Sequence, residues 1–359
     1  MDFGLSEEQE LLQDTVRSFV AKECPAPRLR EIFDGRSDHV PALWRGLCEL
    51  GVTGLAVPEP YGGAGLEVLD LALMSEVIGG GALPGPFFGN ALATLALTWG
   101  GSEEQRARWL PKLAAGDAIG TLAIGAHSRG GEPGDWPVRI DGGLVTGGVD
   151  FVPSAEVADL LVVGVAGGGL ALVECGASGV AITPLDALDR TRRVARVELS
   201  GTPGELLSEG VAAASRLRDA ALVLLAADAF GAAWQLLRMT IGYSSAREQF
   251  GTPLNQFQAV KHQIADAATA LEPARGLLWY AAHAIDHLPE RAPHAAAVAK
   301  AHITDRAFEV AKATVELHGG IGYTWESDVQ IWFKRVLFDR AFLGTPDVHR
   351  QRGADLAGW

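Results

Sequence analysis

The sequence predicts a mainly α-helical protein with a small β domain at its centre. Three observations support this prediction: helical periodicity in the first third, a glycine-dense middle with alternating apolar residues, and alanine-rich helical segments in the last part. The predicted domains are an N-terminal helical domain over residues 1–120, a β domain over residues 121–207 and a C-terminal helical domain over residues 208–359. A chain of 359 residues, 48% of them hydrophobic, is long enough to bury such a core.

Two segments of the first third carry the signal of a helix start. Ser6 is followed three residues later by Gln9, and Ser102 is followed by Gln105, which is the spacing of a capping box. Apolar residues recur on one helical face behind the first of these starts. Between the two helices, residues 58–65 (Pro-Glu-Pro-Tyr-Gly-Gly-Ala-Gly) predict a turn-rich loop.

The middle of the chain changes to a period of two. Asp141-Gly142-Gly143 is a strong turn signal between short extended runs. Residues 160–163 and 170–173 are apolar and predict buried strands, and residues 194–199 predict another. Three arginines stand just before that last strand, and charge patterning favours a solvated strand edge for them: Arg190, Arg192 and Arg193.

From about Val211 onwards the pattern is helical again. One predicted helix covers residues 226–246, and a later one spans roughly residues 295–318. Four prolines are interpreted as marks of helix starts or ends, because proline cannot supply the N–H of a helix interior: Pro253, Pro273, Pro289 and Pro293.

Composition excludes several classes of function. The formal charge of −14 argues against a nucleic-acid partner, which needs a basic face. The three scattered cysteines predict buried thiols in a reducing compartment, and no Cys/His cluster has metal-ligand spacing, so no metal site is predicted. The start of the chain has no basic stretch followed by an apolar run, and the apolar stretch at residues 220–227 is too short to span a bilayer. The sequence therefore predicts a cytoplasmic protein without a membrane partner.

Two strings in the last third could contact a nucleotide. In Arg247-Glu248-Gln249-Phe250-Gly251, the arginine can pair bidentately with a phosphate, while Gln249 and Phe250 can complete the contact. After the later helix, Gly319-Gly320 would let backbone amides approach a diphosphate closely. Each string alone is also explained as an ordinary helix end rich in glycine, and His318 between them is more often a structural residue.

Taken together and in order, the strings are more specific. Residues 247–251, 257–258, 317–322 and 343–345 resemble the C-terminal domain of the acyl-CoA dehydrogenase family, and residues 58–65 resemble its Pro-Glu-x-Tyr-Gly-Gly-x-Gly loop. The resemblance implies an N-terminal helical domain, a middle β-barrel or sandwich and a C-terminal four-helix bundle. It also implies FAD bound between two subunits and oxidation of an acyl-CoA to a 2,3-enoyl-CoA. In the family, a Glu takes the α-proton while the β-hydride passes to flavin N5.

The resemblance places one set of FAD contacts on this chain. Arg247, Gln249 and Phe250 match residues that hold the diphosphate and adenine of the neighbouring subunit's cofactor. The remaining matches are a polar contact and a backbone clamp: Gln258, and Glu316 with Gly319 and Gly320.

The set that holds the flavin ring and performs the chemistry is eroded. Leu343 stands where the family has the catalytic Glu, so no catalytic residue is predicted. Thr345 of the family's Gly-Thr pair remains. The Trp-Ile-Thr that packs on the flavin appears as Phe151-Val152-Pro153, and proline supplies neither a hydroxyl nor an N–H. The family's Thr-Glu-Pro stretch corresponds loosely to Gly125-Ala126-His127.

Some relatives carry the base earlier in the chain, at a position that is Ala221 here. Asp219 lies nearby and is an alternative base through a shifted register. The other interpretation places Asp219 on a solvated helix surface beside Arg218.

The pattern of losses resembles the base-lacking subunit of α2β2 acyl-CoA dehydrogenases of bacterial steroid side-chain degradation. It implies a second dehydrogenase-like subunit that carries the catalytic Glu, an acyl-CoA substrate and an electron-transferring flavoprotein as acceptor. Two alternatives stay open: a self-sufficient flavoenzyme of the same fold with a relocated base, and a non-enzymatic acyl-CoA-binding scaffold.

Overall fold

The computed structural model describes residues 4–36, 40–124 and 131–359, and its first part is helical. Both predicted capping boxes are present: the Ser6 and Ser102 hydroxyls accept bonds from the backbone N–H of Gln9 and Gln105, whose side chains accept from the serine N–H groups. The helices of this part are α1 (Glu7–Glu23), α2 (Ala26–Phe33), α3 (Val40–Glu49), α4 (Val68–Gly80), α5 (Phe87–Gly100) and α6 (Glu103–Ala115), with short 3-10 turns η1 (Val52–Gly54) and η2 (Glu59–Tyr61).

The predicted loop at residues 58–65 follows the η1 turn and contains η2. Gly63 in this loop has no alternative, because a Cβ at that position would lie 2.0 Å from the Val57 carbonyl oxygen.

The middle of the chain forms two four-stranded sheets. One has the order β1-β4-β5-β8 and the other β2-β3-β7-β6. Valines and leucines from both sheets share one apolar cluster, so the sheets pack as a sandwich. The turn predicted at residues 141–143 joins β2 to β3. The bounds are β1 (Gly120–Ala123), β2 (Arg139–Asp141), β3 (Leu144–Pro153), β4 (Leu160–Val165), β5 (Gly169–Glu174), β6 (Val180–Leu185), β7 (Val194–Pro203) and β8 (Glu205–Leu206), with 3-10 turns η3 (Pro133–Asp135) and η4 (Ala155–Val157).

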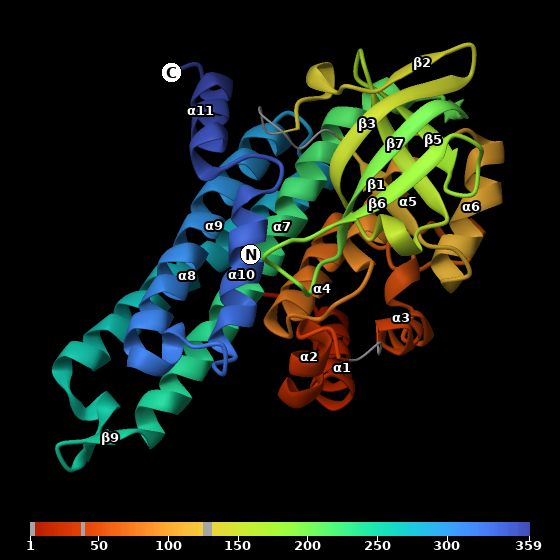
Figure 1. Cartoon of the computed structure of the whole chain (residues 1–359). Coiled ribbons are helices and arrows are strands. Elements are labelled where there is room, and N and C mark those ends of the chain that lie inside the picture. Colours follow the sequence, from red (N-terminus) through yellow and green to blue (C-terminus); the bar gives the residue numbers. More distant parts are fainter. Residues whose placement is uncertain (1–3, 37–39, 125–130) are drawn as a thin grey trace.

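The last part is a bundle of long helices that run side by side (Figure 1). Its elements are α7 (Gly210–Ala246), the hairpin of β9 (Glu248–Gln249) and β10 (Thr252–Pro253), η5 (Leu254–Gln256), α8 (Gln258–His287), α9 (Ala292–Leu317), η6 (Gly319–Tyr323), α10 (Val329–Ala341) and α11 (Pro346–Ala357). The predicted fold class, mainly helical with a central β part, is confirmed. The interpretation of Pro273 as a helix boundary is wrong: it lies inside α8, where it removes one backbone donor.

Helix α7 is the centre of the core and contacts α4, α5, α8, α9 and α10. It is apolar on all sides, as expected for a helix surrounded by others. By length and composition it could cross a membrane, with a window of mean hydropathy 1.7, yet 89% of that window is buried inside the protein. Burial of this kind is what the core helix of a folded domain shows, so the composition alone is weak support for a membrane span.

The two ends of the bundle carry different groups of the residues singled out from the sequence. At one end α7 runs into the β9–β10 hairpin (Figure 1), and α9 ends beside it: the Thr240 hydroxyl lies 3.1 Å from that of Thr314, and the rings of Tyr243 and His318 stack at 4.4 Å. Helix α10 then returns along the bundle, and Leu343 lies two residues beyond its last residue, Ala341. The 13 residues of α10 correspond to about 20 Å, so Leu343 lies far from the hairpin end.

Candidate flavin-binding and catalytic site

The predicted nucleotide contacts gather at the hairpin end of the bundle. They come from the end of α7, the β9 strand, the start of α8 and the end of α9, and every one of them is exposed: Arg247, Gln249, Phe250, Gln258, Glu316, Gly319 and Gly320. Phe250 is the extreme case, with 95% of its surface accessible. These seven residues are called the clamp residues below.

Structural residues hold the clamp in place. The buried His318 ring stacks on Tyr243, and its Nδ1 lies 2.7 Å from the Thr314 carbonyl oxygen. Burial lowers the pKa of His318, which favours the neutral ring. His318 therefore joins the ends of α7 and α9, as the structural interpretation of this residue predicts.

The clamp fits the diphosphate and adenine half of FAD. A Cβ on Gly319, Gly320 or Gly251 would meet nothing within 4 Å in this chain, so their backbone is open to close approach. Within the described ranges no carboxylate forms an ion pair with Arg247, which leaves its guanidinium for an anionic ligand. An exposed aromatic ring, Phe250, stands beside these donors.

At the other end of the bundle lies Leu343, the residue that the sequence matches to the family's base. It is fully buried and has a φ of +57°, a left-handed conformation that leucine rarely adopts. Its carbonyl oxygen accepts a hydrogen bond of 2.8 Å from Nε2 of the buried His349. The side chain of Leu343 packs near Gly131 and cannot accept a proton.

Asp219 lies in a buried ion cluster and is only 2% exposed, so the prediction of a solvated helix surface is wrong. Its Oδ1 accepts bonds from Arg218 at 2.7 Å and from Arg352 at 2.9 Å, and both arginines also reach Glu132. Burial raises the pKa of Asp219, and the two guanidinium groups oppose this shift. One oxygen shared by two arginines is poorly suited to remove a proton from carbon.

The backbone at the position of the family's flavin-packing residues is held by the β part. The Pro153 carbonyl accepts a bond of 2.5 Å from the Thr121 hydroxyl, and Pro153 ends a strand whose register shifts between Val149 and Val152. Phe151 has a φ of +57°, as expected at such an irregularity. The positions predicted to match the family's Thr-Glu-Pro stretch, residues 125–127, lie outside the described residues.

A small cavity of about 20 Å³ lies between Pro153 and the helices α4, α5, α7 and α10. That is room for about one water molecule. Stacked groups lie beside Arg192 and Phe88, which line this cavity: Phe338 stacks on Phe342 at 5.0 Å, and the Arg192 guanidinium lies 5.0 Å from the Phe338 ring and 5.5 Å from Phe88.

Arg192 lies buried beside the rings of Phe88 and Phe338, so the prediction that it lies at a solvated strand edge is wrong. It is buried and lies 2.7 Å from Asp228 of α7 and 2.9 Å from Asp339 of α10. Arg335 binds Asp228 through two further bonds, of 2.7 and 2.8 Å. Although burial acts to raise it, the two arginines lower the pKa of Asp228 to about 2, whereas burial raises that of Asp339. Arg190 and Arg193 remain exposed, as predicted.

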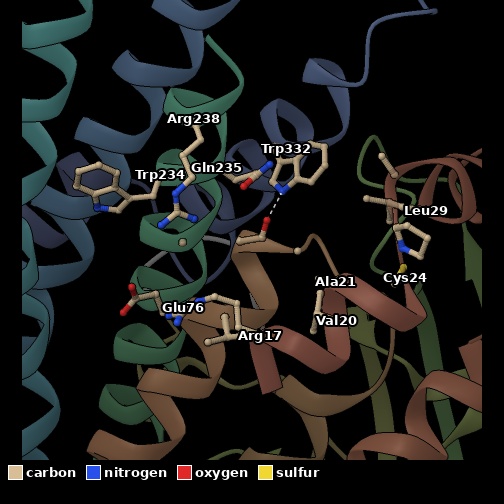
Figure 2. Close-up of a pocket in the computed structure, with 16 residues that line it drawn as sticks. Arg17, Val20, Ala21, Cys24, Leu29, Glu76, Trp234, Gln235, Arg238 and Trp332 are labelled. Carbon is tan, nitrogen blue, oxygen red and sulfur yellow. Dashed lines mark hydrogen bonds between the residues drawn. The ribbon is translucent and has the colours of Figure 1, made fainter. Parts of the chain in front are cut away.

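A larger cavity of about 250 Å³ lies between α1, α4, α7 and α10 (Figure 2). Figure 2 shows Arg17, Glu76 and Arg238 on one side of it, and Trp332, whose indole N–H donates to the Gly80 carbonyl at 2.9 Å. Burial raises the pKa of Glu76, which also accepts a bond from Arg275. None of the residues predicted to bind flavin or to stand at the base position lines this cavity, so it is not the catalytic pocket.

Acid should destabilise this protein through His349. Burial, with nearby positive charges, lowers the pKa of His349 to about 3, whereas an unfolded histidine titrates near 6.5. Between these values only the unfolded state takes up the proton, so stability falls as the pH falls, by about 1.4 kcal/mol per pH unit. We expect the free energy of unfolding in urea to drop by about 2 kcal/mol more between pH 7 and pH 5 in the wild type than in His349→Gln. Equal pH dependence in the two proteins would contradict this.

The fold and the two ends of the bundle place this protein among flavin-dependent dehydrogenases. Family models of the acyl-CoA dehydrogenase N-terminal domain and C-terminal domain match residues 6–117 and 209–357. The chain is 33% identical to "Acyl-CoA dehydrogenase IpdE2" of Mycobacterium tuberculosis over 95% of its own length and 94% of that protein. The chain thus belongs to the acyl-CoA dehydrogenase family, and the predicted family and its cofactor, FAD, are confirmed.

Two solved structures are similar over nearly their whole length. A variant of the Tcur3481-Tcur3483 steroid ACAD has a TM-score of 0.89 and 32% identity, covering 98% of each chain. The ChsE4-ChsE5 complex of Mycobacterium tuberculosis has a TM-score of 0.90 and 28% identity, covering 100% of each chain.

Proposed function

We propose that this chain is the base-lacking subunit of a heteromeric, FAD-dependent acyl-CoA dehydrogenase. In this proposal the chain completes the FAD site of a partner subunit that carries the catalytic Glu. One observation supports it above all: the clamp residues are all exposed at one end of the bundle, while the base position at the other end holds a fully buried leucine.

The residues of this chain would then bind and orient, and would not transfer protons. Arg247 would pair with the diphosphate, Gln249 and Gln258 would add polar contacts, and the Gly319-Gly320 backbone would lie against the cofactor. FAD, when bound, supplies the acceptor of the β-hydride. Without a carboxylate at Leu343 this chain lacks general-base catalysis, which is typically worth about 10²–10⁴-fold in rate.

The similar proteins favour a steroid-derived substrate and a two-chain assembly. One similar structure is named a steroid ACAD, and the other is a complex of two differently named chains. We therefore propose an α2β2 complex that dehydrogenates the CoA ester of a steroid side chain in the cytoplasm and passes electrons to an electron-transferring flavoprotein. The specific acyl group rests on this similarity and on no residue described above.

Two other functions are less well supported. A self-sufficient enzyme would need a base, and Asp219 is held by two arginines, as described above. A scaffold without redox function would not need the open glycines of the clamp, nor an Arg247 that has no carboxylate partner among the described residues. Flavin content separates the three: stoichiometric FAD on the chain expressed alone would favour the self-sufficient enzyme, and absence of FAD from every complex would favour the scaffold.

The experiment that tests the proposal is co-expression with a second acyl-CoA dehydrogenase-like chain. The mass of the purified complex and its FAD content are then measured. We expect equal numbers of the two chains and one FAD for every two chains. One FAD on every chain, or a homomer that turns over an acyl-CoA alone, would contradict the proposal.

Restoring the carboxylate should not restore activity. The variant Leu343→Glu places a carboxylate at the family position, but Phe151-Val152-Pro153 still stand where the family has the Trp-Ile-Thr that packs on the flavin. Proline supplies neither a hydroxyl nor an N–H there. We expect the purified homomer of this variant to show no acyl-CoA-dependent reduction of an electron acceptor above background. Leu343→Gln, of the same size but without the acid, controls for folding by circular dichroism. Robust turnover by Leu343→Glu alone would show that the site is intact apart from its base.

A further inference from the structure

A pair of histidines on α8 faces the start of α4, at the end of α8 opposite to the clamp residue Gln258. His283 and His287 are four residues apart, which places them on one face of the helix, and their rings stack at 4.4 Å. Both are exposed. Neither has a role in binding FAD or in the family's reaction as described above.

Glu67 brings a carboxylate to the same point. It caps the N-terminus of α4, and its two oxygens lie 2.8 and 2.9 Å from Nε2 of His287. One ligand atom from each of Glu67, His283 and His287 lies within 4.8 Å of the other two. Among the residues that the structure describes, this is the one group of three such side chains that meets this distance.

We propose that Glu67, His283 and His287 form a binding site for a zinc-type divalent ion. Two imidazole nitrogens and one carboxylate, with a fourth position left for water, are a ligand set that zinc takes in proteins. Ligands at about 2.0–2.2 Å around a tetrahedral ion lie about 3.3 Å from each other, so small rotations of these exposed side chains would bring them into place. Magnesium and calcium ions fit this site less well than zinc does, because both prefer oxygen ligands and the site offers two nitrogens.

The backbone around the site is already fixed without a metal. Asp286, between the two histidines, accepts a bond of 2.8 Å from the backbone N–H of Val68 and pairs with Arg216 at 2.7 Å. The start of α4 and the end of α8 are therefore held together before any ion binds. Because little order has to be created on binding, the cost of forming the site is low.

A bound ion would link two segments that are distant in the chain. Glu67 and His287 are 220 residues apart, and they belong to the first helical part and to the C-terminal bundle. A ligand that binds only the folded state stabilises it, so the ion would resist separation of these two parts. The sequence predicted no metal site because the third ligand, Glu67, is about 220 residues away from the two histidines in the chain.

The test uses the full chain without a purification tag, freed of metal with EDTA. Zinc is titrated by calorimetry, and we expect one ion per chain, no binding of magnesium, and a rise in the thermal unfolding midpoint. His283→Ala and His287→Ala should each weaken zinc binding by more than about tenfold. His262→Ala, an exposed histidine on the same helix, is the matched control and should bind as the wild type does.

Two results would overturn the proposal. One is the absence of zinc binding to the protein at the zinc concentration that half-saturates free imidazole in solution. The other is zinc binding that survives in the double variant His283→Ala/His287→Ala, which would place the ion elsewhere. Glu67→Gln separates a metal site from a simple ion pair: it should weaken zinc binding while both histidines remain.

Discussion

Replacing Asp228 by alanine is expected to cost the protein about 3–5 kcal/mol of its free energy of unfolding. The Asp228 carboxylate is the partner of two buried arginines, Arg192 and Arg335, at 2.7–2.8 Å. Without it, the hydrogen bonds that Arg335 keeps among the described residues are those to the Leu83 carbonyl at 3.2 Å and to the Thr191 hydroxyl at 2.9 Å. An uncompensated charge in the interior accounts for the expected loss, which urea unfolding of the isolated chain would measure.

The neighbouring carboxyl group of Asp339 limits the loss of stability in Asp228→Ala. Burial, with the Asp228 charge close by, raises the pKa of Asp339, so removal of Asp228 would let Asp339 ionise and partly replace it. The free energy of unfolding of the double variant Asp228→Ala/Asp339→Ala should therefore fall by more than the sum of the losses in the two single variants. Asp347→Ala removes an exposed aspartate from an ion pair with Arg350 and serves as the control, with an unfolding midpoint close to wild type. A loss below about 1 kcal/mol for Asp228→Ala would contradict the assigned role.

Local signals in the sequence predicted local structure well. The capping boxes at Ser6 and Ser102 and the turn at residues 141–143 each depend on a few neighbouring residues, and the structure shows all three. Pro273 shows the limit of such signals. The packing of α8 against α7 and α9 tolerates the one missing donor, so the helix continues through it.

Buried charges could not be placed from the sequence, because their partners come from distant elements. Arg192 follows the β part, yet it pairs with Asp228 and Asp339 from two separate helices. A usable signal did exist: Asp219 and Asp228 lie in a helix that is apolar on all sides, where a charge has no solvated face. Charges in such a helix predict buried pairs.

The sequence predicted those residues of the candidate site that belong to recognisable motifs, and no others. The sequence indicated the clamp residues and the leucine at the base position, and the structure shows where they lie: at opposite ends of the bundle. It could not indicate that the Arg192 guanidinium lies over the rings of Phe88 and Phe338, since these residues meet only after the β part docks on the helices.

Replacing Arg247 by alanine is expected to weaken flavin binding in the proposed heteromeric complex by about 10- to 100-fold, although Leu343 stands at the predicted base position of this chain. A charge-assisted bond to a phosphate contributes about 1.5–3 kcal/mol, and within the described residues Arg247 has no carboxylate partner that would compete for it. The measurement is FAD retained per complex after gel filtration, together with the rate at saturating FAD. Arg247→Lys should recover only part of the affinity, because an ammonium group cannot bind two oxygens in the same geometry.

The assembly state distinguishes a cofactor contact from a structural one. If Arg247 binds FAD, the complex of Arg247→Ala should keep its mass and lose flavin, and added FAD should restore much of its rate. Arg291→Ala, an exposed arginine at the start of α9 and at the other end of that helix from Glu316, should change neither quantity. A complex that falls apart in Arg247→Ala would assign this residue to subunit contact. Full flavin and full rate in Arg247→Ala would remove the clamp residues from the partner's active site and, with them, the proposed division of labour between the two chains.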